Sequence, residues 1–249
     1  MASPALREWV LGIDISAAEG EVALLDRGGS ESRVVPLDPS VRGARALLPA
    51  LAHLLEMGGA DREAIAGVGV ALGPGAFTGL RVGLATAKGL ALGLERPLYG
   101  FSSLEAMALS AWDLWEATEE RTPPAWVLPY RDARHGEVFW ALFGPAAPDG
   151  EFLRPLRARD DQVARPEEIP IPAKGALLLA GTREDLPAPW RREVLGPRAR
   201  HFEMKAAAGA VARLAREALE RGEPPAPADL EPRYGRKPRA QTQWAVPEG

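Results

Sequence analysis

The stretch Trp9–Leu25, WVLGIDISAAEGEVALL, decides the fold. An apolar run that ends at Asp14 is followed by a short turn and by a second apolar run from Gly20, which is the pattern of a β-hairpin. The same order returns from Trp126, 117 positions later, in WVLPYRDARHGEVFW. Both stretches share WVL, an aspartate at the end of the first run and GEV in the second. The repeat predicts two duplicated α/β halves, each opened by a hairpin.

Two helices are predicted between the hairpins. Residues 42–57 carry leucines over more than the arc of about 100° that one buried face needs. A buried strand over 65–72 runs into GPGAFTGLR at 73–81, which opens a second helix that ends at Leu94. Small residues recur in this helix every four positions, so we expect close packing on two sides. The surplus apolar surface predicts a subunit interface formed by Leu47, Leu48, Leu51, Leu54, Leu55, Phe77, Thr78, Leu80, Arg81, Gly83, Leu84 and Ala87.

Composition excludes several classes of protein. With 249 residues, 46% hydrophobic and 26% charged, the chain is long and apolar enough to fold. A net charge of −4 argues against nucleic-acid binding through overall basicity, and the absence of cysteine excludes thiol chemistry and disulfides. The longest uncharged run, residues 64–80, contains five glycines and a proline, so we expect no membrane span and a cytoplasmic protein. The excess of arginine over lysine and the absence of asparagine suit a thermophile.

Catalytic motifs are missing from the sequence. The three histidines, His53, His135 and His201, do not have the i, i+4 spacing that places two imidazoles on one helix face toward a metal. No G-x-S-x-G motif marks a serine nucleophile. We therefore expect neither a catalytic residue nor a metal site.

A phosphate site is the more serious candidate. The GPG turn at 73–75 follows a buried strand and precedes a helix, where backbone N–H groups bind anions, but no G-K-[ST] follows it. A tight strand-to-helix connection explains the same glycines equally well. In the first hairpin, Ser16 stands where actin-like ATP-binding hairpins favour glycine, and its Cβ hinders the approach of a phosphate. We therefore predict at most a degenerate nucleotide site, formed by Asp14, Ser16, Gly73, Gly75 and Asp132.

Five blocks of sequence, in order over residues 9–236, resemble the TsaB family. They are LGIDIS at 11–16 before the GEVALL run, ALLP at 46–49, GPGAFTGLR at 73–81, DARHGEVFW at 132–140 and EPRY at 231–234. The glycine-rich block is the most specific of them. Two departures from the family's pattern are Ile15 in place of its usual threonine and Val41-Arg42-Gly43 before the first helix.

The resemblance implies an actin-like, Hsp70-like (ASKHA) fold of two duplicated α/β halves. It implies a non-catalytic partner of the TsaD transferase, which forms N6-threonylcarbamoyladenosine at position 37 of bacterial tRNA, together with the TsaE ATPase. It also implies either a homodimer or a heterodimer with TsaD. The isolated chain would hold no cofactor, and ATP or ADP and metal would be bound by the partner subunits. tRNA would be reached indirectly through the complex.

Two other functions stay open. An ATP-dependent kinase of the actin and sugar-kinase superfamily has acids such as Asp14 and Asp132 but needs intact phosphate hairpins. A general dimeric interaction module needs neither the acids nor the phosphate hairpins. The expected division of the chain is an N-terminal half over 1–105, a C-terminal half over 106–232 and a tail over 233–249.

One basic cluster stands out on this acidic chain. It comprises Arg233, Arg236, Lys237 and Arg239. A solvated tail explains it, and so do phosphate contacts to tRNA that position the nucleic acid without choosing a base.

Overall fold

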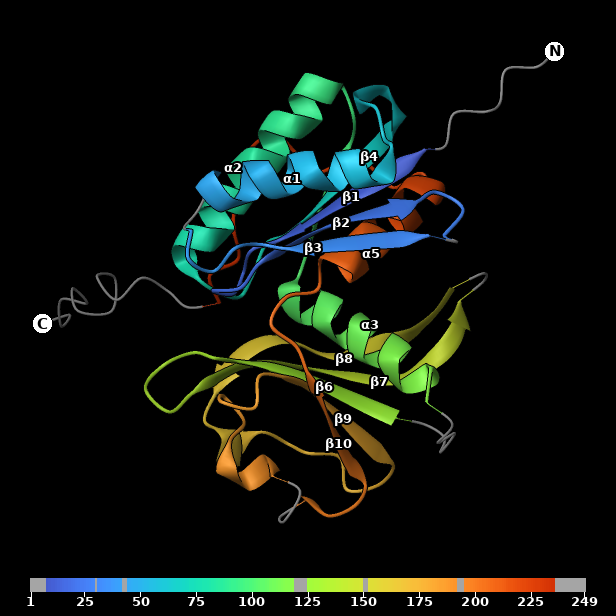
Figure 1. Ribbon diagram of the computed structural model, residues 1–249. Coiled ribbons are helices and arrows are strands. Elements are labelled where there is room, and N and C mark those ends of the chain that lie inside the picture. Colours follow the sequence, from blue (N-terminus) through green and yellow to red (C-terminus); the bar gives the residue numbers. More distant parts are fainter. Residues whose placement is uncertain are drawn as a thin grey trace, which may run out of the picture.

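The computed structural model describes residues 8–29, 31–41, 44–118, 125–149, 152–191 and 195–235. The chain forms two α/β halves, one above the other (Figure 1). Among the described residues, no helix has both the length and the apolarity needed to cross a bilayer.

The first half is a five-stranded sheet in the order β3-β2-β1-β4-β5. β1 (Trp9–Asp14) and β2 (Glu21–Asp26) form the predicted hairpin, β3 (Ser32–Pro36) extends it antiparallel, and β4 (Ile65–Ala71) and β5 (Leu98–Phe101) are parallel to β1. The predicted helices α1 (Ala44–Gly58) and α2 (Phe77–Leu94) lie side by side over one face of this sheet (Figure 1). The short 3-10 helix η1 (Arg62–Ala64) leads into β4.

The second half repeats the same topology. Its strands are β6 (Ala125–Asp132), β7 (Val138–Asp149), β8 (Phe152–Ala164), β9 (Ala176–Gly181) and β10 (Ala199–Glu203). Their order, β8-β7-β6-β9-β10, matches that of the first sheet, with the same parallel and antiparallel pairings. The predicted duplication is therefore confirmed. Two 3-10 helices, η2 (Pro166–Glu168) and η3 (Ala188–Trp190), lie in the connections.

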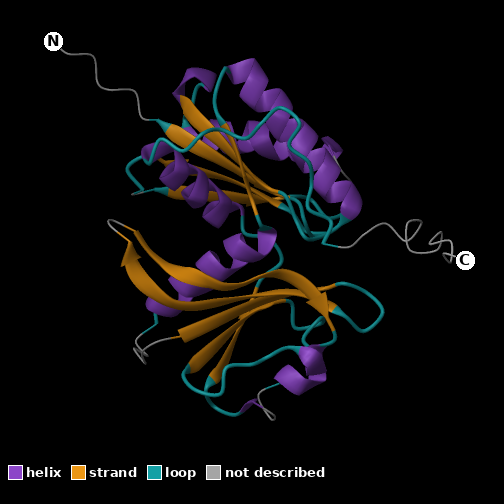
Figure 2. Ribbon diagram, turned by 180° about the vertical axis from the view of Figure 1, so that it is seen from behind, coloured by secondary structure: helices purple, strands orange, loops and turns teal. Residues whose placement is uncertain are grey.

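Two helices lie between the sheets, and each belongs with one of them (Figure 2). α3 (Ser103–Glu116) packs on the second sheet, whereas α5 (Ala208–Glu220), near the end of the chain, packs on β1, β2 and β4 of the first. The expected boundary at residues 105/106 falls inside α3, and the expected second half wrongly included α5. The physical reason is that α5 buries its apolar stripe on the face of the first sheet that α1 and α2 leave uncovered.

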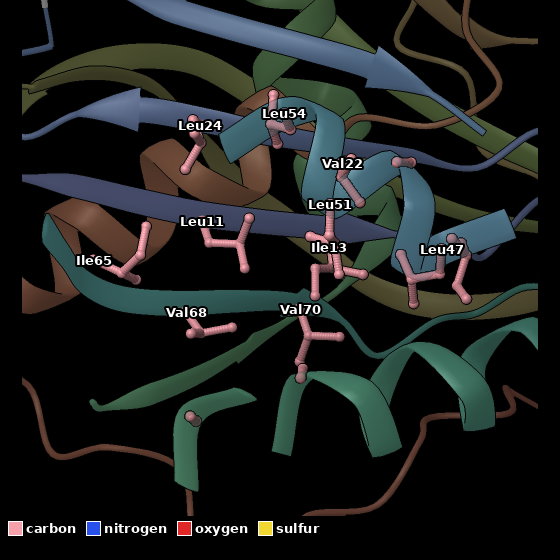
Figure 3. Packing of buried hydrophobic residues seen from close by; sticks show 14 of the residues in the cluster. Leu11, Ile13, Val22, Leu24, Leu47, Leu51, Leu54, Ile65, Val68 and Val70 are labelled. Atoms are coloured by element: carbon pink, nitrogen blue, oxygen red, sulfur yellow. The ribbon is translucent and has the colours of Figure 1, made fainter. Parts of the chain in front are cut away.

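Glycines in the central strands allow α5 to approach its sheet closely. A Cβ on Gly12 of β1 would lie 2.2 Å from the backbone oxygen of Ala208, and one on Gly69 of β4 would lie 2.8 Å from that of Val211. On the opposite face, larger side chains from the sheet and α1 fill the core (Figure 3). They include Leu11, Ile13, Val22, Leu24, Leu47, Leu51, Leu54, Val68 and Val70.

We predict that Gly12→Ala lowers the free energy of unfolding by about 3 kcal/mol, because the new methyl group overlaps the backbone of α5. The matched control is Gly89→Ala in α2, where a Cβ meets nothing within 4 Å. This control should raise the free energy of unfolding by about 0.5–1 kcal/mol through helix propensity. Urea unfolding measures the free energy of unfolding of both variants. If Gly12→Ala unfolded at the same urea concentration as the wild type, α5 would not pack tightly on β1.

Candidate functional site

A cleft of about 670 Å³ lies between the two halves, where the β1–β2 and β6–β7 turns face each other. Its lining includes Ser16 from the first turn, Arg131 and Asp132 from the second, and Gly75 and Phe77 at the start of α2. The duplicated topology explains this position, because it places equivalent strand ends on opposite sides of one junction. The residues of the predicted nucleotide site are therefore judged by their side-chain environment at this junction.

Asp14 is fully buried at the end of β1 and has structural partners on both oxygens. Oδ1 accepts hydrogen bonds from the backbone N of Ser16 at 3.0 Å and from the Ser16 hydroxyl. Oδ2 accepts one from the backbone N of Ala207 at 2.9 Å, at the beginning of α5. Glu21 lies beside it and accepts from the backbone N of Ala208 at 3.4 Å. Two carboxylates therefore stabilise the positive end of the α5 dipole.

Arg131 of β6 brings a positive charge to the same place. Its side chain is 11% exposed, and Nη2 lies 3.9 Å from Oδ2 of Asp14. Burial lowers the pKa of Arg131, and the charge of Asp14 opposes that effect. Burial also raises the pKa of Glu21. The charge of Asp14 is thus compensated within the protein by Arg131. Among the described residues, no group of three or more His, Asp or Glu side chains is arranged to hold a metal ion.

Asp132, the counterpart of Asp14 in the second hairpin, has a different environment. Its side chain is 35% exposed, accepts from the backbone N of Arg134 at 2.8 Å, and lies 3.4 Å from the Arg134 guanidinium. Arg134 and His135 both have positive φ, so the turn itself is tightly wound. The structure therefore places the two predicted aspartates near the cleft in unequal roles, one buried and one at the rim.

The glycine-rich turn is explained by backbone packing. A Cβ on Gly75 would lie 2.2 Å from the Ser16 backbone oxygen, and one on Gly79 would lie 2.1 Å from that of Ile15. Gly73 has φ +107°, and a Cβ there would lie 2.5 Å from the Arg233 backbone oxygen. The turn thus touches the first hairpin and the C-terminal segment. A tight strand-to-helix connection, one of the two explanations left open by the sequence, accounts for these glycines.

The C-terminal segment brings Tyr234 to the start of α2. The Tyr234 ring stacks on Phe77 with 4.7 Å between centroids, and its hydroxyl accepts a hydrogen bond from Nε of Arg81 at 2.8 Å. The backbone N of Arg233 donates to the Leu72 oxygen at 2.7 Å. The other members of the basic cluster, Arg236, Lys237 and Arg239, lie outside the described residues.

The residues predicted to form a subunit interface divide by burial. Leu48, Phe77, Thr78 and Arg81 are exposed, and Leu55 is partly buried. The remaining seven are buried inside the chain, so for them the prediction of a direct partner contact was wrong. Apolar periodicity marks them because α1 and α2 need a buried face against their own sheet. These residues are Leu47, Leu51, Leu54, Leu80, Gly83, Leu84 and Ala87.

Sequence reasoning assigned no role to Arg131, Glu21 or Tyr234. A charged residue directly after the apolar run WVLPY, at the end of the predicted strand, was the available signal for Arg131. Tyr234 belonged to a recognised block, but nothing local indicated that it would stack on a residue 157 positions away.

The repeated sheets, the helices between them and the cleft at their junction define an actin-like α/β protein. The family model described as TsaD, tRNA N6-adenosine threonylcarbamoyltransferase, matches residues 28–176. The tRNA threonylcarbamoyladenosine biosynthesis protein TsaB of Escherichia coli is 37% identical over 136 residues, which cover 54% of each chain. The Haemophilus influenzae TsaB is 32% identical over 162 residues, covering 64% of this chain and 65% of that protein.

A solved structure agrees with the sequence relatives. YeaZ from Pseudomonas aeruginosa superposes with a TM-score of 0.72 at 26% identity, covering 91% of this chain and 99% of that one. The matched stretches span between about half and two thirds of the length of the two curated relatives. The chain belongs to the family that the TsaD model describes, and within it to the TsaB branch.

We predict that Asp14→Ala lowers the free energy of unfolding by about 3–5 kcal/mol, because it leaves Arg131 buried without its counter-charge and removes the acceptor at the start of α5. Asp132→Ala is the matched control from the repeated hairpin and should cost less than about 1 kcal/mol, because its partner is exposed. Chemical denaturation measures the free energy of unfolding of both variants. An equal decrease in the two variants would show that Asp14 has no larger structural role than Asp132.

Proposed function

We propose that this chain is a non-catalytic subunit of the bacterial system that forms N6-threonylcarbamoyladenosine at position 37 of tRNA. Its task is to bind and support a TsaD-like transferase, which works together with a TsaE-like ATPase. Membership of the TsaB branch carries the proposal. The internal pairing of Asp14 with Arg131 supports it, because the buried acid of the cleft is already occupied.

The kinase alternative is disfavoured by the same site. An ATP-dependent kinase needs a free acid and room for phosphates beside the first hairpin, and here Ser16 fills the space against Gly75. The nucleotide and metal of the reaction are accordingly proposed to lie on the partner subunits. Contact with tRNA is proposed to be indirect, through the complex. A general interaction module would share the fold but leave tRNA modification unchanged when the chain is depleted.

The proposed docking surface is the outer face of α1 and α2. Leu48 is 56% exposed, Met57 44%, Phe77 52% and Leu92 82%. These apolar side chains come from two neighbouring helices on one side of the first sheet (Figure 1). Exposed apolar groups gathered on one face mark protein–protein contacts. We propose that the face binds the TsaD-like subunit and, in its absence, a second copy of this chain.

We predict that Leu48→Glu and Leu92→Glu each weaken binding of the TsaD-like subunit by roughly tenfold or more, because a charge is forced into an apolar contact. Leu156→Glu is the control, since Leu156 is 45% exposed on β8 of the other half. Sedimentation velocity with the purified partner measures affinity, and tRNA modification by the reconstituted system measures function. Binding that tolerates both helix variants as well as the control would place the interface elsewhere.

We predict that the isolated chain hydrolyses no ATP above background and does not bind Mg-ATP tightly. The reason is that both oxygens of Asp14 already accept hydrogen bonds inside the protein and that Oδ2 also lies 3.9 Å from the Arg131 guanidinium. Isothermal titration and a phosphate-release assay check this. Micromolar Mg-ATP affinity that Asp14→Ala abolishes, in protein shown to be folded, would favour the kinase.

A further inference from the structure

An exposed arginine near the start of α2 is held in place by two aromatic rings. The guanidinium carbon of Arg81 lies 4.0 Å from the centroid of the Phe77 ring and 5.8 Å from that of Tyr234. Its Nε donates to the Tyr234 hydroxyl at 2.8 Å. Among the described residues, Arg81 has no ion pair with a carboxylate. Its charge therefore has a fixed position and no acidic partner in that part of the chain.

The position of Tyr234 depends on the C-terminal segment, residues 223–235. The backbone N of Ala226 donates to an oxygen of β5, and that of Arg233 donates to the oxygen that follows β4, both at 2.7 Å. Between these two points, Leu230 packs against the core of the first half. The segment is thus anchored to the first half on both sides of Leu230, and Tyr234 directly follows the second anchor.

A groove of about 340 Å³ lies between α2 and the C-terminal segment. It is lined by Arg81, Leu84, Ala85, Lys88, Glu231, Pro232 and Tyr234. Two cations face one carboxylate there, so the groove favours an acidic side chain over a basic one. Lys88 already donates to the backbone oxygen of Ala228 at 2.7 Å. Arg81 is therefore the cation that offers its terminal nitrogens to a partner.

Phe77 connects this groove with the proposed docking face. Its side chain is 52% exposed on that face and also contacts Tyr234 and Arg81. Arginine and tyrosine are enriched among the residues that dominate binding energy at protein interfaces. A side chain that is already held in one conformation loses less entropy when a partner binds it. A guanidinium pairs best with a carboxylate, to which it can donate two parallel hydrogen bonds.

We propose that the TsaD-like partner contacts the C-terminal segment as well as α2 and places a carboxylate against the guanidinium of Arg81. Tyr234 is a positioning residue in this contact, because its ring and its hydroxyl hold Arg81 in the required orientation. The inference rests on the proposed function and adds to it the chemistry that the partner must present.

The test measures the affinity of the purified TsaD-like subunit for the full chain at several salt concentrations. Arg81→Gln should weaken binding about tenfold or more and make it less dependent on salt, because a charge-assisted contact is lost. Arg159→Gln is the matched control, since it removes the same charge from an exposed residue on β8 of the other half. The control should change the affinity less than about twofold and leave the salt dependence as in the wild type.

Tyr234→Phe separates positioning from folding. It keeps the stacked ring and removes the hydroxyl, so we expect binding about threefold weaker at an unchanged melting temperature. In the Arg81→Gln background the same change should have no further effect, because the hydroxyl acts through Arg81. Tyr99→Phe is the matched control, since the Tyr99 hydroxyl lies 3.4 Å from the backbone oxygen of Glu223 at the other end of the segment. Its affinity should equal that of the wild type.

The outcomes distinguish this inference from the proposed function. If the wild-type chain binds the partner and supports tRNA modification while Arg81→Gln keeps full affinity and salt dependence, the inference is wrong and the function stands. If the wild-type chain does not bind the partner, both are wrong. A loss in Arg81→Gln that is confined to self-association would place a second copy of this chain against Arg81 and overturn the assignment. Equal weakening by Tyr234→Phe with and without Arg81 would refute the positioning role.

Discussion

The carboxylate of Asp14 is the interaction on which this structure depends. It ends β1, fixes the following turn through Ser16, meets the start of α5 at Ala207, and neutralises Arg131 from the other half. These contacts join segments 193 residues apart in the sequence. A buried charge with one partner removed is costly, so each segment is held in place by the others. The same pairing joins the two halves of the chain at the cleft.

The recognisable sequence blocks meet around this junction. The first hairpin packs on the glycine-rich turn, the turn packs on the C-terminal segment, and Gly235 of that segment lies against Phe139 of β7. At each of these contacts a Cβ would come within 3 Å of a neighbouring atom. Close packing between blocks therefore accounts for their glycines. The outer faces of α1 and α2 take no part in this packing and carry the exposed side chains of Leu48, Met57, Phe77 and Leu92.

Local patterns allowed several elements to be predicted from the sequence. The β1–β2 hairpin, α1, β4 and α2 occur where apolar periodicity and turn residues placed them. The candidate site was predicted less well. Asp14 was identified but not its partner Arg131, and the leucines of α1 were assigned to a partner although Leu47 and Leu51 face their own sheet. Periodicity reveals that a helix has an apolar face, but not which surface covers it.

The sequence by itself indicated the duplication, because two hairpins repeat the same order of motifs, and the two sheets have matching topology. It also determined that His spacing offers no metal pair and that the chain has no cysteine chemistry. Only the tertiary structure decided that α5 returns to the first sheet, that Arg131 meets Asp14, and that Tyr234 stacks on Phe77. The physical reason is that these contacts join residues more than one hundred positions apart, and no short-range pattern of polarity specifies such a pairing.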